Sequence, residues 1–591
     1  MRPTWIALLV VAVAAAAFGQ GASSAIVGTV TSKGKPLVRA RVTIDSAVLQ
    51  NVRVTTTTTR GTYWAGVLPP GTYNVTFSHA GTQTMTRKTE VRLGQTTRLD
   101  AEIEPSTEGE EITTTAIVRS ILERPQIDTS LSSAEINDLP IAREITARDT
   151  LAPGVLGISI RRSASNAYIV DGVEQRVRGD NVEVEEAIGF DSVIQTPISP
   201  EYGRFSGGVV VATTRSGGND LDGSMRDTIT SERWIVGGEP QGASLHSKGE
   251  VVLGGRIIRD ALWYFLAGET GSTALDGRER SAMAKLTGSP DSHDTIIGMV
   301  LRATRPDESR AAIDYTTVPT KNSVIEARAD TSRVIYGRER HGAVAAHVFI
   351  PAHVGGEHTI TAGAEEFRSG VCGVAMGTEP CREQRQTAVF IGDDWVAGRW
   401  VVTAGLRRDS DTGSSPRGGI VYDLFPDGHA RISATYARYA ASPGDTARET
   451  TLAYAQRVFT NGFGRAALVR RDYEFGAHYR AVEGELRMIY LLFTIGGTMT
   501  VAQHGGNTAA VWLSATPPAL EQHVNASILE RYRTGDAATD LSMQYRFGRF
   551  MVEPFIKVDL MNIFNRTMPV LYGEDPVGSH RALRLSIGAR L

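Results

Sequence analysis

Cysteine, excess positive charge and long hydrophobic runs are all scarce in this chain of 591 residues. The formal net charge is −3, so no basic surplus indicates nucleic acid as a partner. After residue 20 there is no run of about 18 apolar residues, which excludes membrane-spanning helices from the rest of the chain. The HExxH, GxSxG and P-loop motifs are also absent. We therefore expect no catalytic residues, no metal site and no cofactor.

The two cysteines, Cys372 and Cys381, lie in the stretch SGVCGVAMGTEPCRE between two strand-like segments. This position places them at the tip of a loop, where they can close a small disulfide in an oxidising compartment. The alternative, a metal-binding pair, lacks a nearby histidine. The sequence therefore favours a disulfide between them.

The N-terminus has the layout of a secretory signal peptide, which we assign to residues 1–22. Arg2 precedes an apolar run from Ile6 to Phe18, and small residues follow. The run is short for a membrane-spanning helix, although an uncleaved anchor is the alternative. An exported chain without further helical spans is either soluble outside the cytoplasm or a β-barrel in an outer membrane.

Residues 23–104 predict a small β-sandwich. Short β-branched runs such as IVGTVTS, ARVTIDS and TYNVTFSH alternate with glycine and proline turns. Residues 105–125 become acidic, then extended and then polar, which is typical of a linker. Within this linker, residues 112–116 can form one strand, which has no obvious partner nearby.

Residues 126–220 predict a mixed domain of helices and strands. The segment SSAEINDLP begins a helix, with Ser132 or Ser133 as the N-cap and Glu135 near the third position. REITARDTLAPGV gives a second helical piece that ends at a Pro-Gly pair, and AYIVDGVEQ gives a strand that ends in an Asp-Gly turn. EYGRFSGGVVVATTRSGGN (201–219) predicts one strand between two glycine pairs, which we expect to allow tight turns.

Residues 221–591 repeat an alternation of apolar and polar side chains. In HARISATYARYA, Ile432 and Tyr436 lie on one face and Arg431 and Thr435 on the other. A soluble sandwich also alternates, but here charged residues occupy strand centres over a long stretch. Segments of about ten residues with this pattern are typical of a membrane barrel with a wet lumen, which must close because no sheet edge can face lipid. We find about 18 candidate strands, and 16–22 are feasible at about 9–11 residues a strand.

Several stretches resemble TonB-dependent outer-membrane receptors. AYIVDGVEQ and SPEYGRFSGGVVVATTRSGGND resemble the plug signature of that family, and LPIARE with LAPGV resembles an earlier part of the plug. FIGDDWVAGRWVVTAGLRRD and PFIKVDLMNIFNR resemble barrel segments. GTV, GKPLVRARVTI and LPPGTYNVTF resemble the carboxypeptidase regulatory-like domain, which points to the Oar-like branch. The plug signature comprises Asp171, Gly172, Glu201, Tyr202, Gly203, Arg204, Gly207 and Gly208.

The resemblance implies a mostly β architecture in three parts. These parts are an N-terminal transthyretin-like β-sandwich, an α+β plug at 126–220 and a transmembrane antiparallel barrel of 22 strands at 221–591. The implied location is the outer membrane of a Gram-negative-type bacterium, with the sandwich in the periplasm. The implied partners are a TonB-type energy-coupling protein, outer-membrane lipid, the barrel-assembly machinery and an unknown extracellular ligand, without nucleic acid.

In this family a short extended segment before the plug, the TonB box, adds as a strand to the coupling protein. Strand addition needs exposed backbone more than particular side chains. The best match here is β-prone and follows the acidic linker: it comprises Glu111, Ile112, Thr113, Thr114, Thr115 and Ala116. A plain linker strand is the alternative. Likewise, Asp171 and Arg204 either pair with wall charges so that the plug can be displaced, or form ordinary salt bridges.

The resemblance predicts energy-coupled uptake of a scarce, bulky solute and no enzymatic activity. Two alternatives stay open. One is a surface or adhesion protein that keeps the plug and barrel without active transport. The other is a secreted multi-domain β protein, such as an enzyme with a sandwich accessory domain, which would be recovered from the culture supernatant.

Overall fold

The computed structural model describes residues 24–591, apart from short segments within that range. The proposed signal peptide and both cysteines lie outside the described residues. Among the described residues, no helix is both long and apolar enough to cross a membrane. The segments left out within 24–591 are 47, 51, 93–95, 106–110, 119–124, 142, 144, 176–183, 232–233, 235–244, 274–276, 292–293, 305–306, 321, 335–336, 352–354, 372–381, 426–427, 460–461, 491–492, 504–505, 516–522, 534–535 and 549–551, with 567–580.

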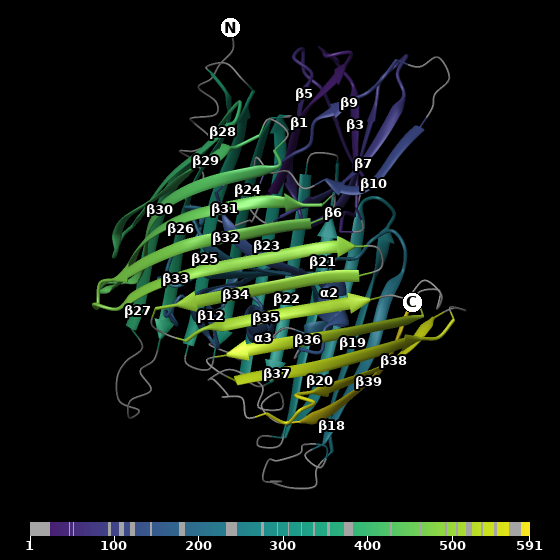
Figure 1. Ribbon diagram of the computed structural model, residues 1–591, viewed down its shortest axis with the longest axis vertical. Helices are drawn as coiled ribbons and strands as arrows, with labels where there is room; N and C mark the ends of the chain where they lie inside the picture. Colours follow the sequence, from purple (N-terminus) through teal and green to yellow (C-terminus); the bar gives the residue numbers. More distant parts are fainter. Residues whose placement is uncertain are drawn as a thin grey trace.

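The N-terminal domain is a sandwich of two five-stranded sheets (Figure 1). One sheet has the order β2-β1-β5 with β8 and β9 beside β1, and the other has the order β10-β7-β6-β3-β4. Alternate apolar side chains such as Ile44, Val75 and Phe77 are fully buried between the sheets. The strands are β1 (Ser24–Ser32), β2 (Lys35–Pro36), β3 (Arg41–Asp45), β4 (Arg53–Thr56), β5 (Thr62–Leu68), β6 (Gly71–Ser78), β7 (Thr84–Val91), β8 (Thr96–Arg98), β9 (Ala101–Glu102) and β10 (Glu111–Val118).

Strand β10 has a partner that the sequence did not predict. It pairs in parallel with β7, with Ile112 opposite Met85 and Thr113 opposite Thr86. Since β10 is the last strand of its sheet, only one of its two edges is paired within the described residues.

The segment between sandwich and barrel combines short helices with a five-stranded sheet of order β11-β16-β17-β14-β15. Ser132 is the N-cap of the first helix and forms a capping box with Glu135, which confirms that prediction. The predicted strand after Gly208 is β17. The elements are β11 (Ile127–Ser132), α2 (Ser133–Asp138), α3 (Ile145–Asp149), β12 (Val155–Leu156), β13 (Ser159–Ile160), β14 (Ala167–Val170), β15 (Val173–Gln175), η1 (Glu185–Ala187), β16 (Ile188–Thr196) and β17 (Val209–Thr214).

The remaining strands form a closed antiparallel barrel from β18 to β39, which confirms the prediction of 22 strands. The first and last strands close it, with Met225 opposite Ala589. The barrel strands are β18 (Asp222–Ser231), β19 (Leu245–Ile258), β20 (Leu262–Thr273), β21 (Gly277–Gly288), β22 (Asp294–Thr304), β23 (Asp307–Thr320), β24 (Ser323–Val334), β25 (Gly337–Ile350), β26 (Glu357–Val371), β27 (Arg382–Ala397), β28 (Trp400–Asp409), β29 (Gly413–Asp423), β30 (Ala430–Ser442), β31 (Asp445–Val458), β32 (Gly462–Tyr473), β33 (His478–Tyr490), β34 (Phe493–Ala502), β35 (Thr508–Ala515), β36 (Val524–Arg533), β37 (Asp536–Arg546), β38 (Glu553–Met561) and β39 (Ala582–Arg590).

The alternation along these strands separates an apolar outer face from a polar inner face. In β31, Leu452 points outward and is 54% exposed, whereas Glu449 points into the lumen and is 1% exposed. A strand with two such faces suits a wall between lipid and a polar interior.

Candidate functional site between plug and barrel wall

The segment β11–β17 lies inside the barrel and is called the plug here (Figure 1). Ion pairs join it to strands all around the wall. Arg143 of the plug contacts Glu250 of β19 (2.6 Å), Glu185 contacts Lys248 of β19 (2.6 Å) and Glu135 contacts Arg487 of β33 (3.1 Å). The plug is therefore fixed by charge on several sides rather than by one hinge.

The most deeply buried of these pairs surrounds Arg161, just after β13. Its guanidinium binds Glu483 of β33 through two nitrogens (3.0 and 2.6 Å) and Glu449 of β31 through the third (2.8 Å). Arg471 of β32 also donates to Glu449 and to plug carbonyls. Burial alone lowers the pKa of Arg161, but these two carboxylates more than offset it, so the pKa is raised well above its usual range. Each of these charges is out of contact with water, so the loss of any one residue would leave a buried charge without its partner.

A second cluster contains Arg204 of the plug signature. Arg204 binds Glu174 within the plug and Glu365 of β26, both at 2.5 Å. Arg407 of β28 binds the same Glu365 and donates to the carbonyl oxygen of Glu201 (2.9 Å). The structure thus brings Glu201 and Arg204 to one point of the wall, between β26 and β28.

Asp171 and Gly172, also in the plug signature, form the turn between β14 and β15. Both have positive φ (46° and 75°), the backbone that a two-residue hairpin requires and that Asp-Gly favours. The Asp171 carboxylate accepts from the backbone N–H of Thr214 (2.9 Å) and pairs with Lys285 of β21 (2.9 Å). This residue therefore shapes the turn and also anchors it to the wall.

The glycines of the signature act through close packing rather than through the tight turns we expected. Neither Gly207 nor Gly208 has positive φ. A Cβ at Gly207 would lie 1.9 Å from the Asn166 side chain, and one at Gly203 would lie 2.4 Å from the Arg407 guanidinium. Tyr202, which directly precedes Gly203, is buried in an apolar cluster of plug and wall residues. The glycines are thus needed for contact with plug and wall.

Cavities lie on both sides of the plug. One of about 360 Å³ lies between the β12–β13 hairpin and the ends of β33–β35, lined by Arg162, Tyr479 and Thr500. The other, of about 300 Å³, lies between plug, wall and sandwich, and both Asp171 and Lys285 line it. The two cavities are distinct, so the plug separates the two ends of the barrel at these points.

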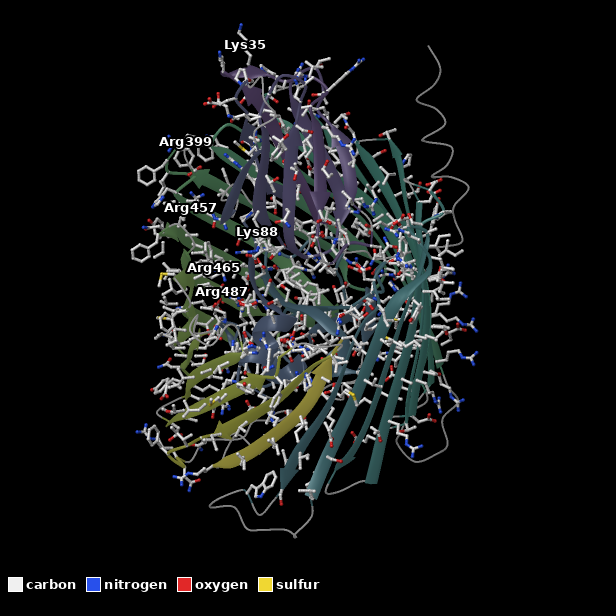
Figure 2. The ribbon with its side chains drawn as sticks, turned by 90° about the vertical axis from the view of Figure 1, so that its right-hand side faces the viewer. Lys35, Lys88, Arg399, Arg457, Arg465 and Arg487 are labelled. Atoms are coloured by element: carbon white, nitrogen blue, oxygen red, sulfur yellow. The ribbon has the colours of Figure 1, made fainter. Side chains whose placement is uncertain are left out.

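The sandwich sits over one end of the barrel (Figures 1 and 2). Trp64 stacks on Phe349 at the end of β25 (ring centroids 6.3 Å apart), and Arg98 pairs with Glu357 at the start of β26 (2.9 Å). Below the sandwich, Arg465 and Arg487, both labelled in Figure 2, face the plug. The sandwich thus caps the end at which the second cavity lies.

One charged group near this end has a strongly shifted pKa. Glu186 of η1 is buried, which by itself raises its pKa. The guanidinium groups of Arg143 and Arg226 reverse the effect, and the pKa falls to about 2. Glu186 is therefore an anion at neutral pH and helps to hold Arg143 at the wall.

Sequence reasoning missed Arg143, although it lies in LPIARE, and Arg161, which lies between the stretches that resemble the plug. Their carboxylate partners are distant in sequence: Arg161 and Glu449 are 288 positions apart. The proposed disulfide between Cys372 and Cys381 stays a prediction for the loop between β26 and β27. The candidate TonB-box residues form β10, and only their backbone pairing is described.

Comparisons with known proteins agree with this architecture. A family described as carboxypeptidase regulatory-like domain matches residues 25–104, and one described as TonB dependent receptor-like, beta-barrel matches residues 283–483. Over 291 residues the chain is 30% identical to the TonB-dependent transporter Oar of Myxococcus xanthus. That match covers 42% of this chain and 27% of the relative, so the chain spans only part of that protein's length.

Solved structures with a similar fold include a siderophore receptor and a ferric-catecholate import receptor. The siderophore receptor PirA from Pseudomonas aeruginosa has a TM-score of 0.65 at 16% identity, covering 78% of this chain and 99% of that one. The ferric-catecholate import receptor Fiu from E. coli has a TM-score of 0.63 at 13% identity, covering 80% and 97%. At such identities the likeness concerns the fold alone.

Proposed function

We propose that the chain, a member of the TonB-dependent outer-membrane receptors, takes up a scarce, bulky solute by energy-coupled transport. It is a protein of the outer membrane, and its sandwich lies in the periplasm. The sandwich end of the barrel is therefore the periplasmic end, and the opposite end is extracellular. The proposal includes no enzymatic step and no cofactor.

The observation that carries this proposal is a barrel closed by a plug that buried charges hold in place. The cavity beside Arg162 opens toward the extracellular end, and the cavity beside Asp171 lies at the periplasmic end. A solute that enters the first can reach the second only if the plug shifts. Work on the plug must come from the periplasmic side, because an outer membrane holds no nucleotide pool.

We infer that β10 receives this work. It is extended, it directly precedes the plug, and it offers one unpaired edge within the described residues. A TonB-type coupling protein that adds a strand to this edge would pull on residues 119–126 and hence on β11 of the plug. The same proposal includes outer-membrane lipid and the barrel-assembly machinery as partners, and an extracellular ligand.

Proline substitutions in β10 test the coupling step. Neighbouring residues of a strand direct their N–H groups to opposite edges, so Ile112→Pro and Thr113→Pro each remove a donor from a different edge. We expect the proline on the free edge of β10 to weaken binding of the purified periplasmic domain of the coupling protein at least about tenfold. It removes one hydrogen-bond donor from that edge and distorts the strand. Binding is measured by calorimetry with the full-length receptor in detergent.

The matched control is Ile112→Val, which keeps the backbone donor and should bind as the native chain does. Hydrogen exchange over 111–118 identifies which proline faces β7, because that variant also loses the pairing within the sandwich sheet. If both proline variants bind the coupling domain with native affinity, β10 is not the coupling segment. If the native receptor does not bind it either, the non-transporting surface protein is favoured.

A further inference from the structure

The extracellular end of the barrel carries arginine side chains on its outer face. In β25, for example, Arg340 is exposed, whereas its neighbours Glu339 and His341 point inward and are 6% and 5% exposed. Because β25 ends beside the sandwich at Ile350, Arg340 lies near the opposite rim. We call the following residues the arginine belt: Arg280, Arg302, Arg333, Arg338, Arg340, Arg368, Arg385, Arg408, Arg438, Arg448, Arg470 and Arg480.

The belt shares its face with the apolar band of the wall. In β28, Arg408 follows the outward residues Trp400 and Leu406, and in β32, Arg470 follows Leu468, which is 56% exposed. The guanidinium groups therefore lie at the boundary between the hydrocarbon layer and the extracellular medium. Arginine tolerates that depth because its long side chain reaches the headgroups.

Many of these arginines are direct cross-strand neighbours of one another. Arg368 is opposite both Arg340 and Arg385, so three strands present one row of like charge. Arg470 is likewise opposite Arg480. The same arrangement joins Arg333 to Arg338 and Arg438 to Arg448. Like charges directly opposite each other destabilise a sheet, so this pattern favours binding of an anion between the strands.

The chain's own carboxylates neutralise only part of the belt. Glu366 binds Arg368 and Arg385, and Asp307 binds Arg302 at 2.6 Å. Within the described ranges, Arg340, Arg408, Arg448 and Arg480 enter no ion pair. These groups remain available to a ligand.

The periplasmic rim of the same outer face differs from the extracellular rim in the type of side chain that it presents. Its outward residues include aromatic side chains, and Trp400 packs on Tyr422 there with ring centroids 4.4 Å apart. Aromatic residues at a membrane interface suit ordinary headgroups. The asymmetry between the rims indicates that the outer leaflet, and not the inner one, supplies the anion.

We propose that the arginine belt binds the phosphate groups of anionic lipid in the outer leaflet, with lipid A as the type of headgroup that fits. Guanidinium groups bind phosphate through paired N–H donors, and a row of them can hold a headgroup with two phosphates. The belt faces the bilayer rather than the lumen, so the ligand is membrane lipid and not the transported solute. The inference depends on the orientation in the membrane and is independent of solute uptake.

Native mass spectrometry of the full-length protein tests this with bisphosphorylated lipid A and, separately, phosphatidylcholine. The test variant is Arg340→Gln with Arg368→Gln and Arg385→Gln. The control, Lys33→Gln with Lys35→Gln and Arg60→Gln, removes the same charge from the exposed sandwich surface. We expect the belt variant to bind lipid A at least about tenfold more weakly, since several charge-assisted contacts are lost, while the control and phosphatidylcholine binding stay unchanged.

Equal binding of lipid A by the native chain and the belt variant overturns the proposal, as does equal loss in the sandwich control. Inorganic phosphate is added as a competitor: if millimolar phosphate alone displaces lipid A completely, the belt is a site for free anions and not for lipid. Folding of each variant is checked by the gel shift between unheated and boiled samples. If the triple variant does not fold, Arg470→Gln with Arg480→Gln on the other side of the barrel answers the same question.

Discussion

Arg161 and Arg162 are adjacent in the plug, yet their surroundings are opposite. Both have positive φ (50° and 72°), so a substitution meets the same backbone conformation at either position. Arg161 is fully buried against Glu449 and Glu483, whereas Arg162 is exposed and donates, among the described residues, only to the carbonyl oxygen of His478 (3.1 Å). Substitutions at these two adjacent positions therefore distinguish the effect of losing a buried charge from the effect of the backbone conformation.

We predict that Arg161→Leu lowers the free energy of opening of the plug by about 3–5 kcal/mol, because two carboxylates stay buried without their partner. Arg162→Leu should change the same quantity by less than about 0.5 kcal/mol, as is usual at an exposed site. Hydrogen exchange over residues 154–170 in the full-length protein measures both. Equal protection in the two variants would show that the Arg161 cluster does not hold the plug.

Among the elements, helix α2 and the barrel strands were predictable because their signals are local. Ser132 and Glu135 carry a capping box over three positions, and a two-residue alternation marks each strand face. The pairing of β10 with β7 was not predictable, because nothing in its side chains specifies which sheet edge it joins. The Arg161 cluster was not predictable either, since its partners meet only when β31 and β33 close around the plug.

Helix α3 and strand β16 pack with two carboxyl groups in close proximity. Asp149 is 3% exposed, and neither of its oxygens has a hydrogen-bond partner among the described residues. Arg148 instead pairs with Asp191 of β16 (3.1 Å). Burial, and then the carboxylate of Asp191, raises the pKa of Asp149 well above its usual range. The folded plug thus favours a protonated Asp149.

This shift makes the plug's stability depend on pH. The pKa of Asp149 in the folded plug lies above its value of about 3.9 in an unfolded chain. Protonated Asp149 therefore contributes its full stabilisation of the plug below that pH, and this stabilisation is lost as the pH rises through the folded pKa. Protection of residues 145–156 against exchange, corrected for intrinsic rates, should fall by up to about tenfold per pH unit within that window. Asp149→Asn should remove the slope, and a native chain without any slope would contradict the shift.

At the scale of the whole molecule, the sandwich closes the periplasmic end over the cavity beside the plug. Val48, Leu49 and Pro69 of the sandwich line that cavity together with plug and wall residues. Trp64 belongs to a cluster with Phe349 and Val324 of the barrel and not to the sandwich's own core. In the transport that we propose, a solute that leaves this cavity must therefore pass the sandwich as well as the plug.

The stacked pair Trp64–Phe349 can be tested without unfolding the sandwich, because it lies outside that core. We predict that Trp64→Ala and Phe349→Ala each weaken docking of the sandwich on the barrel. The double variant should weaken it by less than the sum of the two single effects, with a coupling energy of about 0.5–1.5 kcal/mol for an aromatic pair. Distances between spin labels on sandwich and barrel report the undocked fraction. Val54→Ala, at a half-exposed sandwich site, is the control and should leave docking unchanged. Additive effects would mean that contact between the two rings does not hold the sandwich in place. In that case the Arg98–Glu357 pair is the remaining contact to examine, because it joins β8, a strand of the same sandwich sheet as Trp64, to the next barrel strand.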